Sequence, residues 1–178
     1  VLNLTLVAED PNLWLEEVEG EKALKWVRKQ NKISQKTIEA HPAFKNIHEQ
    51  TLKVLESDDR IPYFKQRGNQ IYNFWQGQEH IRGLWRRTTL EEYKKEDTAW
   101  ETVIDIDKLA KEEKENWVYK GIEVLKPNHE LAIVRLSRGG KDASVYREFD
   151  LNSKTFLPNG FQLEEAKSDL TWIDRNTT

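Results

Sequence analysis

Apolar and neutral side chains in the first third of the chain recur at helical spacing. From residue 19 to residue 40 they return every three or four positions, which predicts an amphipathic helix. A second helix is expected from Pro42 to about Ser57, because proline in a first turn gives up no hydrogen bond. The stretch DPNLWLEE, which starts at Asp10, predicts a short helical turn before both. The positions on the predicted inner faces are Ala23, Trp26, Val27, Ile33, Thr37, Ile38, Phe44, Ile47, Thr51, Val54 and Leu55.

The hydrophobic period changes to two from Arg60 onward. Four strand-length segments follow, separated by Gly, Asn and charged residues, and they are IPYFKQR, QIYNFWQ, GLWRRTTL and WETVIDID. In the fourth segment apolar positions alternate with acidic ones, which is typical of a half-buried outer strand with a wet, charged face. The two expected faces carry Trp100, Thr102, Ile104 and Ile106 on one side, and Glu101, Asp105 and Asp107 on the other.

This block of sequence recurs after 61 positions without a gap. The aligned pairs are Ile61 and Ile122, Phe64 and Leu125, Tyr72 and Ile133, Trp75 and Leu136, Leu84 and Val145, Trp85 and Tyr146, Arg86 and Arg147, Leu90 and Leu151, and Trp100 and Phe161. A four-strand unit that repeats in this way indicates a β-propeller, in which each blade is a four-stranded antiparallel sheet. The first blade is expected at 60–107 and the second at 117–163, and the polar run KLAKEEKENW joins them as a solvated connection.

Two blades cannot close a ring, since propellers typically need about four to eight. The stretch DLTWIDRNTT, after Ser168, resembles the first strand of a third blade. We therefore expect a fragment of a longer protein, and the absence of Met agrees with this; the alternative is that the blades close against other copies. The predicted fold class is mainly β with N-terminal α-helices. It comprises a helical segment at 1–57 and, at 58–178, two propeller blades with the start of a third.

Charge and composition narrow the class of protein. The 178 residues include 28 Lys and Arg against 31 Asp and Glu, a net charge of −3 that argues against a general nucleic-acid binder. Cys is absent, so disulfides and thiolate chemistry are excluded. No apolar run approaches the roughly 20 residues of a membrane helix. The start, VLNLTLVAED, does not resemble a signal peptide, so we expect a cytoplasmic protein, or a periplasmic one if a leader has been removed.

Several short motifs could in principle carry chemistry, but each has a simpler structural explanation. Ser137, Arg138 and the Gly139–Gly140 pair lie between two strand patterns, which favours a hairpin turn over a phosphate loop. The paired carboxylates at 58–59 and at 105 and 107 offer too few oxygens for calcium and no predicted cleft for acid–base work. No metal-ligand spacing connects the histidines, which we expect to be exposed or capping residues. They are His41, His48, His80 and His129.

Longer stretches carry a resemblance to a known family. DPNLWLEEVEGEKALKWVRKQN, SDDRIPYFKQRGNQIYNFWQG, RGLWRRTTLEEY, LSRGGKDASVYREFDL and GFQLEEAKSDLTWID resemble the N-terminal region of the prolyl oligopeptidase family of serine peptidases, and its bacterial members most. The similarity runs from Asp10 to Asp174. It implies that N-terminal helices, packed with a distant catalytic domain, lead into a seven-bladed propeller. That propeller admits oligopeptides to an α/β-hydrolase domain with Ser, Asp and His and excludes folded proteins.

The resemblance brings no catalytic residue to this chain. No serine here stands in the Gly-x-Ser-x-Gly setting of a nucleophile elbow, so the chain by itself is expected to be inactive, without catalytic, cofactor or metal residues. Its expected partners are the rest of its own polypeptide and, for the whole protein, oligopeptide substrates. We also expect the fragment to self-associate, and we expect it not to bind membranes. A noncatalytic propeller that binds other proteins is the alternative function.

The stretch RGLWRRTTLEEY contains adjacent arginines beside a tryptophan, a combination that also suits phosphate contact and base stacking. The repeat separates the two. Arg86 recurs as Arg147, which predicts a structural arginine that buries its stem and bonds across blades. Arg87 is replaced by Glu148, so we expect it merely to face the other way.

Overall fold

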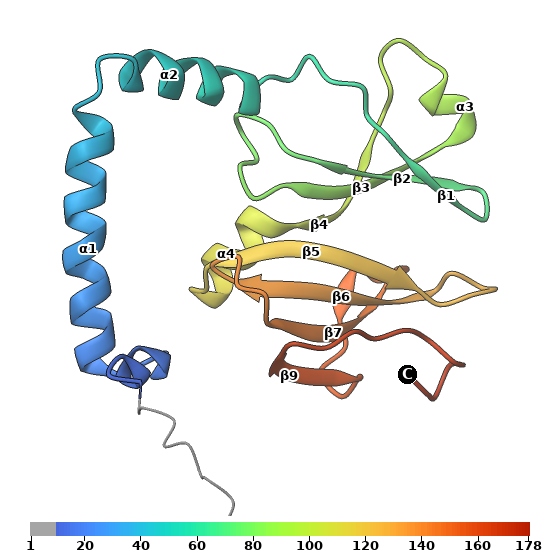
Figure 1. Cartoon of the computed structure of the whole chain (residues 1–178). Helices are drawn as coiled ribbons and strands as arrows, with labels where there is room; N and C mark the ends of the chain where they lie inside the picture. The colour runs from blue at the N-terminus through green and yellow to red at the C-terminus, as the bar shows by residue number, and fades with distance from the viewer. Residues whose placement is uncertain (1–9) are drawn as a thin grey trace, which may run out of the picture. The chain divides into compact units, whose positions relative to one another are not determined.

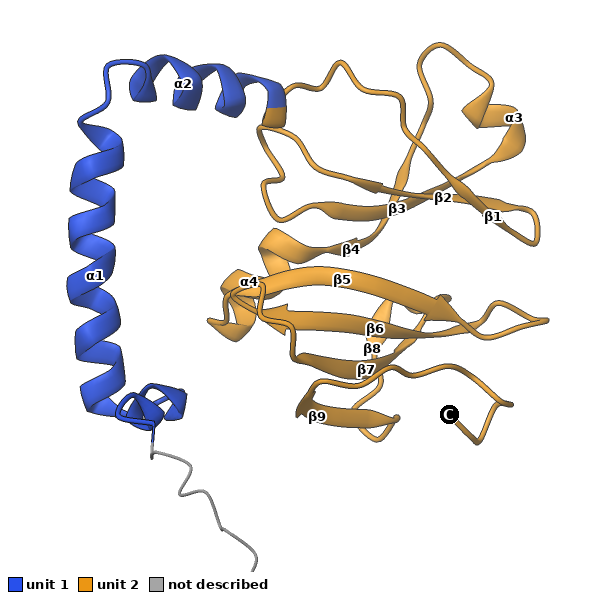
Figure 2. Cartoon of the chain, in the orientation of Figure 1, with its two compact units in different colours: residues 1–54 blue, residues 55–178 orange. Residues whose placement is uncertain are grey.

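The computed structural model describes residues 10–178 (Figure 1). The N-terminal stretch VLNLTLVAED, whose sequence does not resemble a signal peptide, lies almost wholly outside these residues. The chain divides into two compact units, residues 1–54 and 55–178 (Figure 2). The first is helical and the second holds two antiparallel sheets. This mainly β composition with N-terminal helices confirms the predicted fold class.

The helical unit contains a 3₁₀ turn, η1 (Leu13–Glu16), and the helices α1 (Glu21–Glu39) and α2 (Phe44–Leu55). The Asp10 carboxylate accepts the Asn12 amide at 2.8 Å and so fixes the turn. Trp14 meets Trp26 edge to face, with ring centroids 6.3 Å apart. All three predicted helical segments are present. Pro42 lies in the turn that precedes α2 and not, as was predicted, in the first turn of the helix. In that preceding turn the imidazole of His41 accepts the Ala43 amide at 3.2 Å.

The first sheet has the order β1-β2-β3-β4, all antiparallel. Its strands are β1 (Lys65–Arg67), β2 (Gln70–Trp75), β3 (Leu84–Thr89) and β4 (Glu101–Asp105). A short helix, α3 (Leu90–Tyr93), follows β3 because the Thr89 hydroxyl accepts the Glu92 amide at 3.2 Å. The four strand segments that the alternating pattern predicted therefore form one blade.

The second sheet has the order β5-β6-β7-β8, and β9 also pairs with β7. Its strands are β5 (Trp117–Val124), β6 (Leu131–Arg138), β7 (Ser144–Asp150), β8 (Thr155–Phe156) and β9 (Gln162–Ala166). β2 and β6 begin 61 residues apart, as do β4 and β9. The repeat is thus confirmed for β2 with β6 and for β4 with β9, while the first strands of the two sheets, β1 and β5, differ in length.

The connection between the sheets is a helix, α4 (Ile106–Glu113), and most of the predicted solvated run at 108–117 is exposed to solvent. The Asp105 side chain caps it by accepting the Lys108 amide at 2.9 Å, and Ile106 and Ala110 are buried. Asp107 accepts two backbone amides from the loop before β3, at 3.0 and 3.2 Å. The prediction that these two aspartates lie on the wet face of an outer strand is therefore wrong, because Asp105 caps the helix and Asp107 lies in its first turn.

A β-bulge also alters the faces of β4. Trp85 pairs with Ile104 whereas Arg86 pairs with Thr102, so Val103 is the extra residue. Ile104 and Val103 are both buried, and Trp100 stacks on Arg86, whose side chain projects from the opposite face to that of Trp85. The expected common face of Trp100 and Ile104 is consequently wrong.

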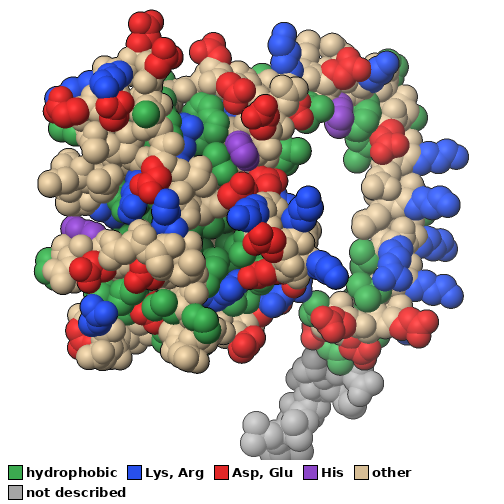
Figure 3. Space-filling model, turned by 180° about the vertical axis from the view of Figure 1, so that it is seen from behind, with side chains coloured by type: hydrophobic (Ala, Val, Ile, Leu, Met, Phe, Trp, Pro, Cys, Tyr) green, Lys and Arg blue, Asp and Glu red, His purple; other side chains and the backbone are tan. Residues whose placement is uncertain are grey.

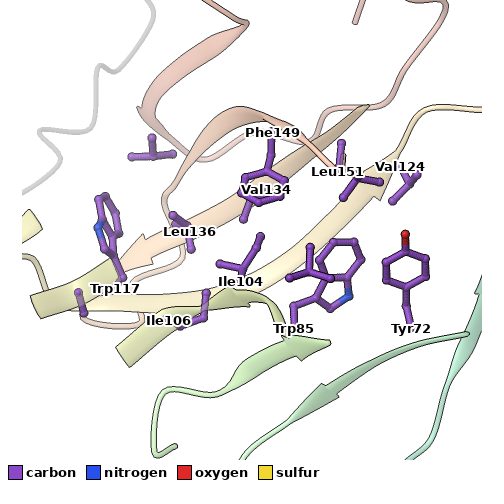
Figure 4. Packing of buried hydrophobic residues seen from close by; sticks show 14 residues of the cluster. Tyr72, Trp85, Ile104, Ile106, Trp117, Val124, Val134, Leu136, Phe149 and Leu151 are labelled. Atoms are coloured by element: carbon purple, nitrogen blue, oxygen red, sulfur yellow. The ribbon is translucent and has the colours of Figure 1, made fainter. Parts of the chain in front are cut away.

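The core lies between the two sheets (Figure 4). Trp85 and Ile104 come from the first sheet, and Val134 and Phe149 from the second; all four are at most 5% exposed. Full burial of a large apolar side chain contributes about 1.5–3 kcal/mol, so these residues hold the blades together. Within the described residues no helix is long and apolar enough to cross a membrane.

Candidate functional site

Arg86, on β3, is held between the rings of Trp75 and Trp100. Its guanidinium carbon lies 4.5 Å from the ring centroid of Trp75 and 4.4 Å from that of Trp100, and its Nε donates to Asn73 at 2.8 Å. Burial lowers the pKa of Arg86 to about 10, well above physiological pH. The residue buries its stem as predicted. Its hydrogen bond stays within the first sheet, and its repeat counterpart Arg147 instead donates to Glu113 at 2.9 Å, at the end of α4.

Arg87 is the arginine of the pair that bonds across the blades, contrary to prediction. Its Nη1 donates to the backbone oxygen of Leu151 in the second sheet at 3.1 Å. Its Nε donates to Glu101, which also receives Lys154 at 2.6 Å from the second sheet. Hydrogen bonds from Arg87 and then Lys154 lower the pKa of Glu101 to about 2. The absence of Arg87 from the repeat concealed this role, since a contact between unlike positions leaves no periodic signal.

The residues singled out in the sequence have structural roles here. Gly139 and Gly140 have φ angles of 67° and 84° in the turn between β6 and β7, so the predicted hairpin is confirmed. His48 stacks on Phe44 within α2, with ring centroids 5.9 Å apart. His129 takes a φ of 56° in the turn before β6. Among residues 10–178, neither His48 nor His129 joins a group of metal-ligating side chains.

One histidine does approach two carboxylates. Ligand atoms of His80, Asp105 and Asp107 lie within 4.8 Å of one another, a grouping that the sequence spacing did not suggest. One imidazole and two carboxylates could ligate a divalent metal. Both carboxylates already accept backbone amides: Asp105 that of Lys108 at the start of α4, and Asp107 those of Arg82 and Gly83 in the loop before β3. Asp105 therefore caps the helix, at the positive end of its dipole, and Asp107 ties the loop before β3 to the first turn of α4.

A cavity of about 410 Å³ lies between the first sheet and β5. Its walls are mainly aromatic. Tyr72 stacks on Trp85 with centroids 4.6 Å apart, and Phe74 stacks on Tyr119 at 4.2 Å. Lys65 and Arg67 contribute the charged part of the lining. This volume and this mixture of aromatic and few polar groups are typical of small-ligand sites.

Helix α1 presents two contrasting sides. Trp26 is 43% exposed, Ile33 53% and Ile38 58%, although all three are large and apolar. Basic residues recur along another side of the same helix at 22, 25, 29, 32 and 36, and Figure 3 shows the row of Lys and Arg side chains. An uncovered apolar stripe of this length is typical of a surface that packs against another part of a protein.

Comparison with known families accounts for these blades and helices together. A family model described as "Prolyl oligopeptidase, N-terminal beta-propeller domain" matches residues 5–178. The chain belongs to the prolyl oligopeptidase family. The resemblance inferred from the sequence is thereby confirmed across almost the whole chain, and the two sheets are blades of the N-terminal propeller of this family.

Two curated members of the prolyl oligopeptidase family are similar in sequence. An uncharacterized peptidase of Sinorhizobium fredii is 42% identical over 172 residues, which are 96% of this chain and 24% of the relative. An uncharacterized peptidase of Rickettsia prowazekii is 33% identical, over 92% of this chain and again 24% of the relative. The chain thus spans about a quarter of the length of the relatives it matches.

Solved structures are also similar to this chain. A post-proline cleaving enzyme from Rickettsia typhi superposes with a TM-score of 0.80 and 34% identity, over 90% of this chain and 24% of that one. Oligopeptidase B from Leishmania major superposes with a TM-score of 0.64 at 13% identity, over 82% of this chain and 20% of that one. The second likeness concerns the fold alone, and both structures extend far beyond the region shared with this chain.

Proposed function

We propose that this chain is the N-terminal scaffold and gating part of a serine-type oligopeptidase of the prolyl oligopeptidase family. The observation that carries the proposal is the family match over residues 5–178, combined with a span of only 24% of peptidase relatives. In this proposal the blades, residues 58–178, form part of a propeller that admits oligopeptides and excludes folded proteins. The whole protein works in the cytoplasm.

The helical segment, residues 1–57, packs with the catalytic domain in this proposal. Support comes from the apolar side of its helices, where Ile38 is 58% exposed, Ile47 59% and Val54 70%. A contiguous apolar surface on a monomer usually marks an interaction site. In the isolated chain the same residues, together with uncovered blade faces, favour self-association.

The chemistry itself is assigned to residues outside this chain. A serine activated by histidine and oriented by aspartate would attack the peptide carbonyl and form an acyl-enzyme, with no cofactor. None of the serines here lies in a Gly-x-Ser-x-Gly turn between a strand and a helix, where backbone amides could stabilise the oxyanion. The 178-residue chain is therefore proposed to be inactive.

The proposal predicts a clear difference between the whole protein and this chain in a hydrolysis assay. Both would be incubated with a panel of fluorogenic oligopeptides that carry proline, a basic residue or an apolar residue before the reporter group. The whole protein should release the reporter and lose activity after treatment with a serine-directed sulfonyl fluoride, and the chain alone should release none. Absence of hydrolysis by the whole protein, with specific capture of a partner protein by its propeller, would instead favour a noncatalytic interaction module.

A further inference from the structure

The cavity between the first sheet and β5 concentrates positive charge without a matching acid. Lys65 and Arg67 are two residues apart on β1, so both side chains project from the same face of the sheet. Neither forms an ion pair within residues 10–178. No Asp or Glu of the described chain lines the cavity. In the strands, Arg87, Arg135, Arg138 and Arg147 each have a carboxylate partner, whereas Lys65 and Arg67 remain available to an external anion.

The aromatic wall holds the Arg67 guanidinium over the cavity. Its central carbon lies 5.5 Å from the ring centroid of Tyr72 and 5.9 Å from that of Trp85. At these distances the ring faces attract the cation and restrict its side chain. A guanidinium supported in this way keeps its planar set of N–H donors, which matches the two oxygens of a carboxylate.

The opposite wall leaves room for a ligand. Gly121 follows a bulge in β5 with a φ of 146°, and a Cβ built on it would meet no atom within 4 Å. Tyr119, which precedes the bulge, also lines the cavity. Burial raises the pKa of Tyr119, so its hydroxyl stays protonated and can donate a hydrogen bond. The cavity therefore offers two cations, a neutral donor and open space.

We propose that this cavity binds a carboxylate of the oligopeptide substrate, with Arg67 and Lys65 as the charged contacts. The neighbouring part of the peptide packs on the stacked rings of Tyr72 and Trp85. The carboxylate belongs either to an acidic side chain or to a free C-terminus, because both present the same planar anion. This inference rests on the proposed function, and it gives the gate a preference for acidic or short peptides.

Calorimetric titration of the whole protein tests the site directly. The probes are four versions of one hexapeptide, Gly-Ala-Phe-Glu-Ala-Gly: with Glu or Gln at the fourth position, and with a free or an amidated C-terminus. Protein pretreated with the sulfonyl fluoride is used where the peptide would otherwise be cut. The charged form should bind at least about tenfold more tightly than the doubly neutral form, since hydrogen bonds to charged groups are the strong ones.

Variants assign that preference to the cavity. Arg67→Gln should abolish the discrimination, Arg67→Lys should keep part of it, and Tyr119→Phe should weaken the charged peptide alone. Lys94→Gln is the matched control, because it removes one positive charge just after α3, where Lys94 is exposed and, among residues 10–178, forms an ion pair with Glu91 alone. It should leave binding unchanged. Unaltered circular dichroism and melting temperature of each variant would show that folding is intact.

The binding data distinguish three outcomes: binding of an acidic side chain, binding of a free C-terminus, and no binding of a carboxylate in the cavity. Loss of tight binding on Glu-to-Gln exchange identifies an acidic side chain, and loss on amidation identifies the C-terminus. Equal binding of all four peptides, or discrimination that survives Arg67→Gln, would overturn the proposal. The titration detects binding whether or not the peptide is cut, so it remains informative if the whole protein proves not to be a peptidase.

Discussion

Arg86 stays charged in a half-buried place because the two flanking rings and Asn73 replace part of its water. The planar guanidinium can stack on Trp75 and Trp100 at once, and an ammonium could not. The repeat counterpart Arg147 solves the same problem differently, with Glu113 as a carboxylate partner and Phe156 as a single ring 3.9 Å away. Arg86 and Arg147 thus occupy equivalent positions in the two sheets but bind different partners.

Substitution of Arg86 tests this account of the residue. We expect Arg86→Ala to lower the free energy of unfolding by about 1–3 kcal/mol, through lost cation–π contacts and an Asn73 side chain left without its donor. Arg86→Lys should recover less than half of the loss. Urea denaturation followed by tryptophan fluorescence measures both. Lys94→Ala, at an exposed helix pair, should cost no more than about 0.5 kcal/mol, and an equal loss there and at Arg86 would contradict the account.

Among the elements, the link between the blades is partly ionic. Glu101 at the start of β4 receives Arg87 from β3 and Lys154 from the turn before β8, and Arg87 also reaches Leu151. The contacts join the outer edge of one sheet to the turn of the next. Since Glu101 is 46% exposed at its side chain, solvent screens them and their combined contribution is modest.

The pKa of Glu101 gives this link a pH signature. Its folded pKa of about 2 lies below the ordinary 4.5, so its stabilisation is present above pH 4.5 and is lost as the pH falls toward 2. Glu101→Gln should therefore lower the free energy of unfolding at pH 7, by at most about 1 kcal/mol after screening, and the difference should vanish near pH 2. Denaturation midpoints of both proteins at several pH values provide the measurement. A difference that is independent of pH would mean that the carboxylate charge does not act here.

The elements that the sequence predicted are those whose signal is periodic. β2, β3 and β4 recur in the second blade because each repeats its own alternation of apolar residues. α4 was missed because its start depends on capping by Asp105, and the alternating pattern had placed this residue in a strand. The cavity was also missed. The spacing of Lys65 and Arg67 predicts that they share one face of a strand, but the cavity opposite them depends on the bulge before Gly121 in β5, which the sequence pattern does not predict. Contacts between blades, such as that of Arg87 with Leu151, carry no local signal at all.

At the scale of the whole molecule, the chain contributes two blades of a ring and a helical unit with an uncovered apolar side. The curated relatives are roughly four times as long as this chain, since it spans 24% of each. In the function proposed above, this chain contributes to substrate selection, and residues outside it cleave the peptide bond.

Labelling with a fluorophosphonate, which reacts covalently with activated serines, tests that division most directly. The whole protein would be labelled, digested and mapped by mass spectrometry, with heat-denatured protein as the control for unspecific reaction. The account predicts one modified serine, beyond Thr178 and within a Gly-x-Ser-x-Gly turn, and no modification of residues 1–178. Label on a serine within residues 1–178, or no label on the native protein at all, would contradict it.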